Sequence, residues 1–87
     1  MDLTQKFADA QARVKTLPAP PTPDNLLELY ALFKQGTVGD VTGERPGMLD
    51  FKGRAKYDAW AGKKGTSKEQ AMQAYVALVD RLFAGER

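Results

Sequence analysis

The chain has 87 residues, of which 43% are hydrophobic and 28% charged, as expected for one globular domain spanning residues 1–87. It contains no cysteine or histidine. This excludes thiolate chemistry and Ser-His or Cys-His catalysis, and makes a zinc site very unfavourable. The net charge is +2, but residues 45–68 hold seven Lys or Arg against two Asp, whereas the remainder is acidic. This distribution favours a local anion site over general polyanion binding.

The first predicted helix covers residues 3–17. Its apolar residues recur at spacings of four and three, at Leu3, Phe7, Ala10, Val14 and Leu17. The proline-rich segment 18–23 ends this helix, because proline donates no backbone hydrogen bond and restricts the residue before it.

A second helix is predicted to begin after Thr22 as N-cap, with Pro23 in its first turn. Its apolar stripe consists of Leu26, Leu29, Tyr30 and Phe33. At 100° per residue, Tyr30 and Lys34 fall within about 40° of each other at one border of the stripe, where Leu27 also lies. The glycines at 36 and 39 indicate its end.

Residues 37–51 show no helical period and are predicted to form an irregular connection. A connection of this length is functional in some domains, and in others it crosses a bundle to join two parallel helices. These alternatives are compatible. Its Met48, Leu49 and Phe51 are expected to form a buried cluster. Its glycines lack the Gly-Lys-Ser/Thr ending of a phosphate-binding loop, and Asp40 and Glu44 show no metal-ligand spacing.

The third predicted helix covers residues 52–63, with Ala55, Ala59 and Trp60 facing inward. The fourth begins at Thr66-Ser67, where Ser67 and Gln70 have the spacing of a capping box. Its helical period runs through Met72, Tyr75, Val76, Val79, Leu82 and Phe83. Four amphipathic helices without a strand candidate predict an all-α, four-helix bundle.

Two interpretations are open for the lysines at positions 34, 52 and 56. These lysines are either a solvated basic face or part of an anion site, since two lysines four apart on a helix repel unless an anion lies between them. Tyr30 and Tyr75 are likewise either core aromatics or rings that present a wet hydroxyl to a ligand. No paired carboxylates stand out, so we expect no catalytic residue.

Three motifs together resemble the acyl-CoA-binding protein family. They are Tyr30-x-x-Phe33-Lys34-Gln35, Glu44-Arg45-Pro46-Gly47-Met48-Leu49-Asp50-Phe51-Lys52 and Lys64-Gly65-Thr66-Ser67-Lys68-Glu69. The resemblance runs through most of residues 7–82. It implies an up-down-down-up bundle with a long crossing connection between helices two and three.

The resemblance also implies which residues bind the ligand. The CoA 3′-phosphate would be held by Tyr30, Lys34 and Lys56, with the adenine near Phe33 and Tyr75 closing the site. Lys15 and Lys52 would lie near the head group. The acyl chain would lie in a groove by Phe7, Leu26 and Leu27. Tyr57 stands where many members have tryptophan, and Phe33 where many have tyrosine.

The function so implied is non-enzymatic binding, transport and buffering of medium- to long-chain acyl-CoA, without a metal or cofactor. The expected protein is a cytoplasmic monomer without stable membrane insertion, with acyl-CoA-using enzymes as candidate partners. The alternative is a small nucleic-acid-binding domain that uses the basic segment 45–68 with Tyr57 and Trp60. A third reading, a bundle that only binds proteins, leaves the Lys52/Lys56 spacing unexplained.

Overall fold

The computed structural model describes residues 2–85, so that residues 1, 86 and 87 of the predicted domain 1–87 lie outside the described residues. It contains four helices in these bounds: α1 (Leu3–Val14), α2 (Pro23–Thr37), α3 (Phe51–Ala61) and α4 (Lys68–Phe83). No strand occurs in this part of the chain. The all-α prediction is therefore confirmed.

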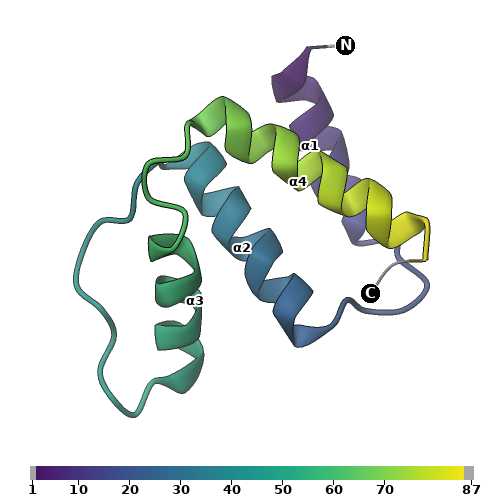
Figure 1. The fold of residues 1–87 in the computed structure, drawn as a ribbon. Coiled ribbons are helices and arrows are strands. Elements are labelled where there is room, and N and C mark those ends of the chain that lie inside the picture. The colour runs from purple at the N-terminus through teal and green to yellow at the C-terminus, as the bar shows by residue number, and fades with distance from the viewer. Residues whose placement is uncertain (1, 86–87) are drawn as a thin grey trace.

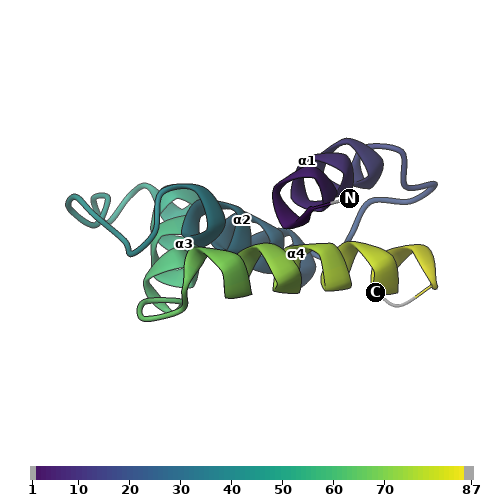
Figure 2. The ribbon, with the colours of Figure 1, turned by 90° about the horizontal axis from the view of Figure 1, so that it is seen from above.

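α2 lies at the centre of the arrangement. It packs against α3 on one side and α4 on the other, while α1 packs against α4. Two views at right angles both place α1 and α3 on opposite sides of the molecule (Figures 1 and 2). α2 and α3 run in the same direction, and α1 and α4 run in the opposite one (Figure 1). The predicted up-down-down-up order is confirmed, and the connection 38–50 crosses back along the outer side of α3.

Each helix begins at a side-chain cap that satisfies a free backbone N–H. Asp2, Thr22 and Asp50 accept hydrogen bonds from the backbone N–H three residues later. Ser67 and Gln70 form the predicted capping box at the start of α4. The Thr22 cap with Pro23 in the first turn is likewise confirmed.

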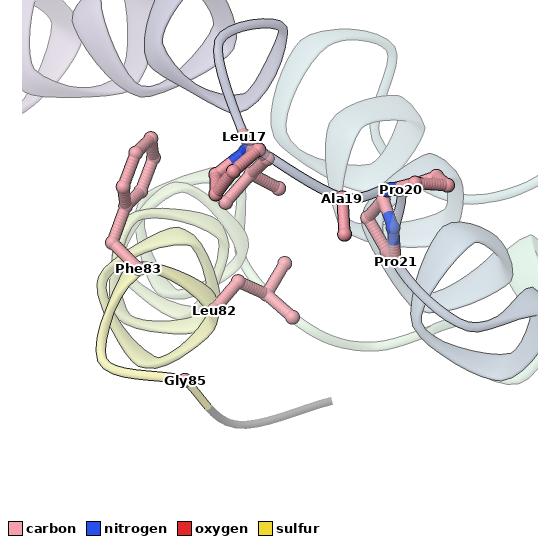
Figure 3. Close-up of a pocket in the computed structure, with 8 residues that line it drawn as sticks. Leu17, Ala19, Pro20, Pro21, Leu82, Phe83 and Gly85 are labelled. Atoms are coloured by element: carbon pink, nitrogen blue, oxygen red, sulfur yellow. The ribbon is translucent and has the colours of Figure 1, made fainter.

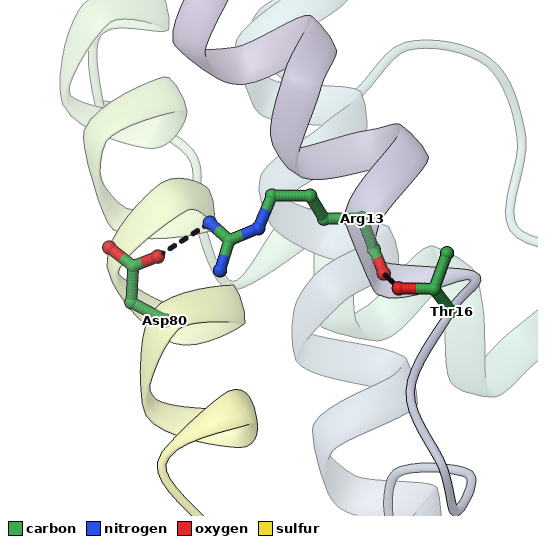
Figure 4. A network of polar contacts seen from close by, with 3 residues as sticks. All are labelled: Arg13, Thr16 and Asp80. Atoms are coloured by element: carbon green, nitrogen blue, oxygen red, sulfur yellow. Dashed lines mark hydrogen bonds and ion pairs between the residues drawn. The ribbon is translucent and has the colours of Figure 1, made fainter.

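α1 ends three residues earlier than predicted, at Val14. The Thr16 hydroxyl and backbone N–H both donate to the carbonyl oxygen of Arg13, at 2.7 and 2.8 Å, and this turn stops the helix before the prolines. The Arg13 side chain extends the other way and pairs with Asp80 of α4 at 2.9 Å (Figure 4). The pair is exposed and contributes roughly 0–1 kcal/mol.

The core is built from α1, α2 and α4. Its buried residues are Phe7, Ala10, Leu29, Leu32, Ala71, Tyr75, Leu78, Val79 and Leu82. Phe83 was predicted to share this face but is 39% exposed; its ring lies under the guanidinium of Arg13, 4.8 Å from the centroid. α3 adds no residue to this cluster, and Trp60 is its one buried residue.

The predicted burial of Met48, Leu49 and Phe51 is wrong. Their exposed fractions are 77%, 89% and 75%. The connection is tied to α3 by the Tyr57 hydroxyl, which donates to the carbonyl oxygen of Gly43, and by the pairing of Arg45 with Asp58. Since α3 itself packs only on α2, the turn before α3 meets no second layer that could cover it.

Candidate functional site

α2 presents two adjacent surfaces with Tyr30 between them. Leu26, Tyr30 and Phe33 follow one another at i, i+4 and i+7, and therefore share one side of the helix. Lys34 lies one turn after Tyr30 and turns toward α3, because its ammonium lies over the ring of Trp60. Tyr30 thus lies at the boundary between the α1/α4 side and the α3 side.

On the first side lies an open groove with a volume of about 360 Å³. Its lining residues are Val14, Lys15, Pro21, Leu26, Leu29, Tyr30, Phe33 and Tyr75. The walls are mostly apolar, and the polar groups come from Lys15 and two tyrosines. The groove brings together five of the predicted ligand residues, namely Lys15, Leu26, Tyr30, Phe33 and Tyr75.

Three lining residues were not predicted. Val14 and Leu29 carry the helical period of their own helices, which indicates burial but does not distinguish a core wall from a groove wall. Pro21 belongs to the proline-rich segment, whose sequence shows where a helix ends and not what it faces. For these residues only the arrangement of α1 and α2 against α4 reveals their place in the groove.

Aromatic rings form the inner wall of the groove. The ring of Tyr75 meets that of Phe7 edge to face at 5.1 Å, and Phe7 lies 6.2 Å from Phe33. Phe7 is buried in the core and does not line the groove, which differs from what the resemblance implied for it. A tyrosine hydroxyl is neutral at pH 7 and can donate a hydrogen bond, and burial raises the pKa of Tyr75 further.

On the second side, two ammonium groups rest on aromatic rings. Lys34 Nζ is 4.8 Å from the ring centroid of Trp60, and Lys56 Nζ is 5.4 Å from that of Tyr30. Neither lysine forms an ion pair with another residue between 2 and 85. Such contacts orient a cation but leave its charge unneutralised. The two ammonium groups therefore suit an anion from outside the chain.

The other two predicted ligand residues are less closely placed. Lys52 is exposed on α3, one turn before Lys56, and Leu27 is half-buried on α2. Neither lines the groove. The predicted residues thus form two groups that adjoin at Tyr30: the groove residues, and Leu27, Lys34, Lys52 and Lys56 on the surfaces of α2 and α3.

α3 is held against α2 by contacts at its C-terminal end. The indole N–H of Trp60 donates to the carbonyl oxygen of Gly39 at 2.8 Å. Gly39 follows α2 with a φ of +97°, a conformation that favours glycine. Lys63 pairs with Glu28 of α2 at 2.7 Å. These contacts determine where Lys56 lies relative to Tyr30.

A buried amide joins α2 to the following connections. The Gln35 side-chain nitrogen donates to Asp40 Oδ1 at 2.9 Å and to the carbonyl oxygen of Thr66 at 2.7 Å. Asp40 Oδ1 also accepts from the backbone N–H of Gly65. This backbone hydrogen bond and that from Gln35 hold the pKa of Asp40 below its usual value. Ionised Asp40 therefore fixes the path that the chain takes away from α2.

A smaller pocket of about 170 Å³ lies between the proline-rich segment and the end of α4 (Figure 3). Its walls come from Leu17, Pro18, Ala19, Pro20, Pro21, Leu82, Phe83 and Gly85. None of these residues is charged or carries a polar side chain. The pocket therefore offers no group that would bind a phosphate, in contrast to the surface around Tyr30.

Trp60 is buried and Lys34 lies over its ring, so this ring does not offer the free face that the nucleic-acid hypothesis required. Within residues 2–85 no group of three or more His, Cys, Asp or Glu is placed to hold a metal ion. None of the four described helices is long and apolar enough to cross a membrane.

The fold and these two adjoining surfaces define a small all-α protein whose surface suits a ligand that is part anionic and part apolar. Residues 4–79 match the family model described as acyl CoA binding protein. The chain belongs to this family.

Known proteins agree with this assignment. The chain is 60% identical over 82 residues to acyl-CoA-binding protein homolog 1 of Caenorhabditis elegans, covering 94% of this chain and 95% of that one. It is 49% identical over 82 residues to the acyl-CoA-binding protein of Saccharomyces cerevisiae, covering 94% of each chain. The crystal structure of Oryza sativa acyl-CoA-binding protein 2 superimposes with a TM-score of 0.92 at 42% identity, covering 97% of this chain and 93% of that one.

Proposed function

We propose that this protein binds fatty acyl-CoA thioesters, one per chain, and carries and buffers them without catalysing a reaction. Family membership and the names of its relatives support acyl-CoA as the ligand. The observation that carries the proposal at the level of residues is the position of Lys34 and Lys56. Neither ammonium group has a carboxylate partner among residues 2–85. Lys56 lies over Tyr30, which lines the apolar groove, and Lys34, one turn after Tyr30, lies over Trp60.

The phosphate end of the ligand would bind at Tyr30, Lys34 and Lys56. A phosphate monoester carries about −1.5 to −2 charges at neutral pH, which would neutralise the two ammonium groups. The Tyr30 hydroxyl would add a hydrogen bond. Each charge-assisted hydrogen bond contributes about 1.5–3 kcal/mol. The phosphate would therefore supply much of the affinity.

The apolar surfaces would bind the remainder of the ligand. Phe33 offers aromatic surface for the adenine, Tyr75 would close the site from the groove wall, and Lys15 lines the groove for the head group. Leu26 and Leu27 would contact the acyl chain, with Lys52 near the head group. Since each buried methylene adds at most about 0.8 kcal/mol, affinity should rise with chain length until the surface is covered. This favours medium- to long-chain esters.

Calorimetry with palmitoyl-CoA tests the site. Tyr30→Phe, Lys34→Ala and Lys56→Ala should each weaken binding by about 10–150-fold, which corresponds to the loss of one charge-assisted hydrogen bond. Lys6→Ala is the matched control, because Lys6 is exposed on α1 outside the groove, and its affinity should not change.

A second titration changes the ligand and keeps the protein intact. Palmitoyl-CoA lacking the 3′-phosphate should bind much more weakly than the complete ester. Equal affinity for both esters, or unchanged affinity in all three variants, would contradict the assignment of Tyr30, Lys34 and Lys56 to the phosphate.

The proposal includes a monomer that acts in the cytoplasm and delivers its ligand to acyl-CoA-using enzymes. The absence of cysteine is compatible with a reducing compartment. Sedimentation of the free and ligand-bound protein tests the monomer, and cell fractionation tests the location.

A further inference from the structure

The most exposed large apolar side chains in residues 2–85 form a tip at the turn into α3. We define the tip as Met48, Leu49 and Phe51, with exposed fractions of 77%, 89% and 75%. Met48 and Leu49 occupy the turn itself, and Phe51 is the first residue of α3. Three large apolar side chains so close together and so exposed need an explanation, because isolated exposed apolar residues are ordinary but clusters mark contact surfaces.

The tip projects from the molecule. The connection 38–50 runs along the outer side of α3 and turns at the end where α3 begins, away from α4 (Figure 1). The view from above also places this connection at the outer edge of the molecule (Figure 2). The turn is held by a hydrogen bond from the backbone N–H of Asp50 to the carbonyl oxygen of Gly47 at 3.0 Å, and by the Asp50 cap of α3. These hydrogen bonds hold the backbone of the tip in place, so its side chains could contact a partner surface without a change in the backbone.

Positive charge lies immediately behind the tip. Between residues 44 and 56 there are four cations and two anions. Arg45 is paired with Asp58, and Asp50 caps α3. Lys52 and Lys56 are exposed and form no ion pair within the described part of the chain. Arg54 differs from them, since its Nε is buried and its charge acts on Asp58. An apolar projection backed by unneutralised cations is complementary to a bilayer with an anionic surface.

We propose that the tip docks this protein on anionic membranes, with Met48, Leu49 and Phe51 entering the interfacial region and Lys52 at the level of the anionic head groups. Docking is peripheral and reversible, since three side chains bury little area. α2 and α3 run in the same direction, so Leu26, near the start of α2, lies toward the same end as the tip. A docked molecule thus has the start of its acyl-binding surface turned toward the bilayer.

Cosedimentation with vesicles, without any acyl-CoA, tests the proposal independently of the proposed ligand. Wild-type protein should bind vesicles of phosphatidylcholine mixed with phosphatidylserine, bind phosphatidylcholine alone much less, and dissociate at high salt. Leu49→Ser combined with Phe51→Ser should weaken vesicle binding by about tenfold or more. Lys52→Gln should weaken it by about fivefold, the effect of one cation near an anionic surface.

Two controls match these changes. Val38→Ser alters an apolar residue that is 47% exposed at the other end of α2, and Lys6→Gln removes an exposed cation from α1. Both should bind vesicles like the wild type. Leu49→Trp adds a direct readout, because its fluorescence should be quenched by brominated lipid, whereas the native Trp60 is buried.

Each other occupant of the tip gives a distinct result that would overturn the proposal. If the serine variant loses palmitoyl-CoA affinity in the absence of vesicles, the acyl chain covers the tip. If the wild type is a dimer by sedimentation and the serine variant is not, a second copy of the chain covers the tip. Wild-type protein that does not bind anionic vesicles, or a serine variant that binds them like the wild type, would also refute docking.

Discussion

At the scale of single residues, Trp60 contributes both to the packing of α3 on α2 and to the position of Lys34. Its indole N–H bonds to Gly39 at the end of α2, its ring packs between α2 and α3, and Lys34 rests on its face. The apolar pattern of residues 52–63 indicated only that Trp60 faces inward. Its partner Gly39 lies 21 residues away in the sequence, and no local pattern could have identified it.

Trp60→Phe should lower the free energy of unfolding by about 1–3 kcal/mol, because it removes a hydrogen bond from a buried site and leaves a smaller ring there. Urea titration followed by far-UV circular dichroism measures this, since the change also removes the only tryptophan. Tyr57→Phe is the control, because it removes a more exposed hydrogen bond to another glycine of the same connection. Its effect should stay below about 1 kcal/mol; equal losses in the two variants would contradict this account.

At the scale of elements, α3 differs from the other helices. α1, α2 and α4 share the core cluster, whereas α3 packs on α2 alone and buries only Trp60. Its sequence explains this, since its other inward residues, Ala55 and Ala59, are small and only half-buried. The helix that carries Lys52 and Lys56 is therefore the one that contributes least to the buried interior.

Backbone amides of α3 should exchange with solvent roughly 10–100-fold faster than those of α4, because α3 can open without disrupting the core. Native-state hydrogen exchange measured by NMR tests this, with the interior amides of α4 as the internal reference. Palmitoyl-CoA should slow the exchange of α3 more than that of α4, since the proposed ligand joins Lys56 to α2. Equal protection of the two helices in the free protein would contradict the view of α3 as a separately opening unit.

At the scale of the whole molecule, charge links stability to pH. Hydrogen bonds from Gly65 and Gln35 lower the pKa of Asp40, and the hydrogen bond from Arg45 lowers that of Asp58. A carboxyl whose pKa is lower in the folded state stabilises the fold above its unfolded pKa of about 3.9, and this contribution is lost as the pH falls through the folded-state value. The chain has no histidine, so no comparable change is expected between about pH 5 and 8.

Stability should therefore be nearly constant from about pH 8 to 5 and fall below about pH 4. Asp40→Asn should be less stable than the wild type at pH 7, and the difference should shrink in acid as Asp40 of the wild type becomes protonated. Thermal unfolding across this range measures both effects. Glu44→Gln is the control, because Glu44 is exposed and has no hydrogen-bond partner in residues 2–85. It should leave the dependence of stability on pH unaltered. An Asp40→Asn difference that is the same at every pH would exclude this role for Asp40.

Local patterns were sufficient to predict much of this molecule. Side-chain periods located the four helices, and the caps at Thr22 and Ser67 located two of their starts, because these features depend on residues within one or two turns. The absence of histidine and cysteine removed whole classes of chemistry. The burial of Met48, Leu49 and Phe51 was predicted wrongly, because an apolar run shows a preference for burial but not whether another layer is available to cover it.

Only the tertiary structure decided which residues meet. Lys56 lies over Tyr30, and Lys34 over Trp60, because α2 and α3 run side by side in the same direction, joined by a connection whose path depends on Gln35, Asp40 and Gly39. The tertiary structure also showed that Phe7 and Tyr75 meet in the core and that only Tyr75 lines the groove. These are contacts between residues distant in the sequence, and they depend on the packing of whole helices, which no single segment specifies.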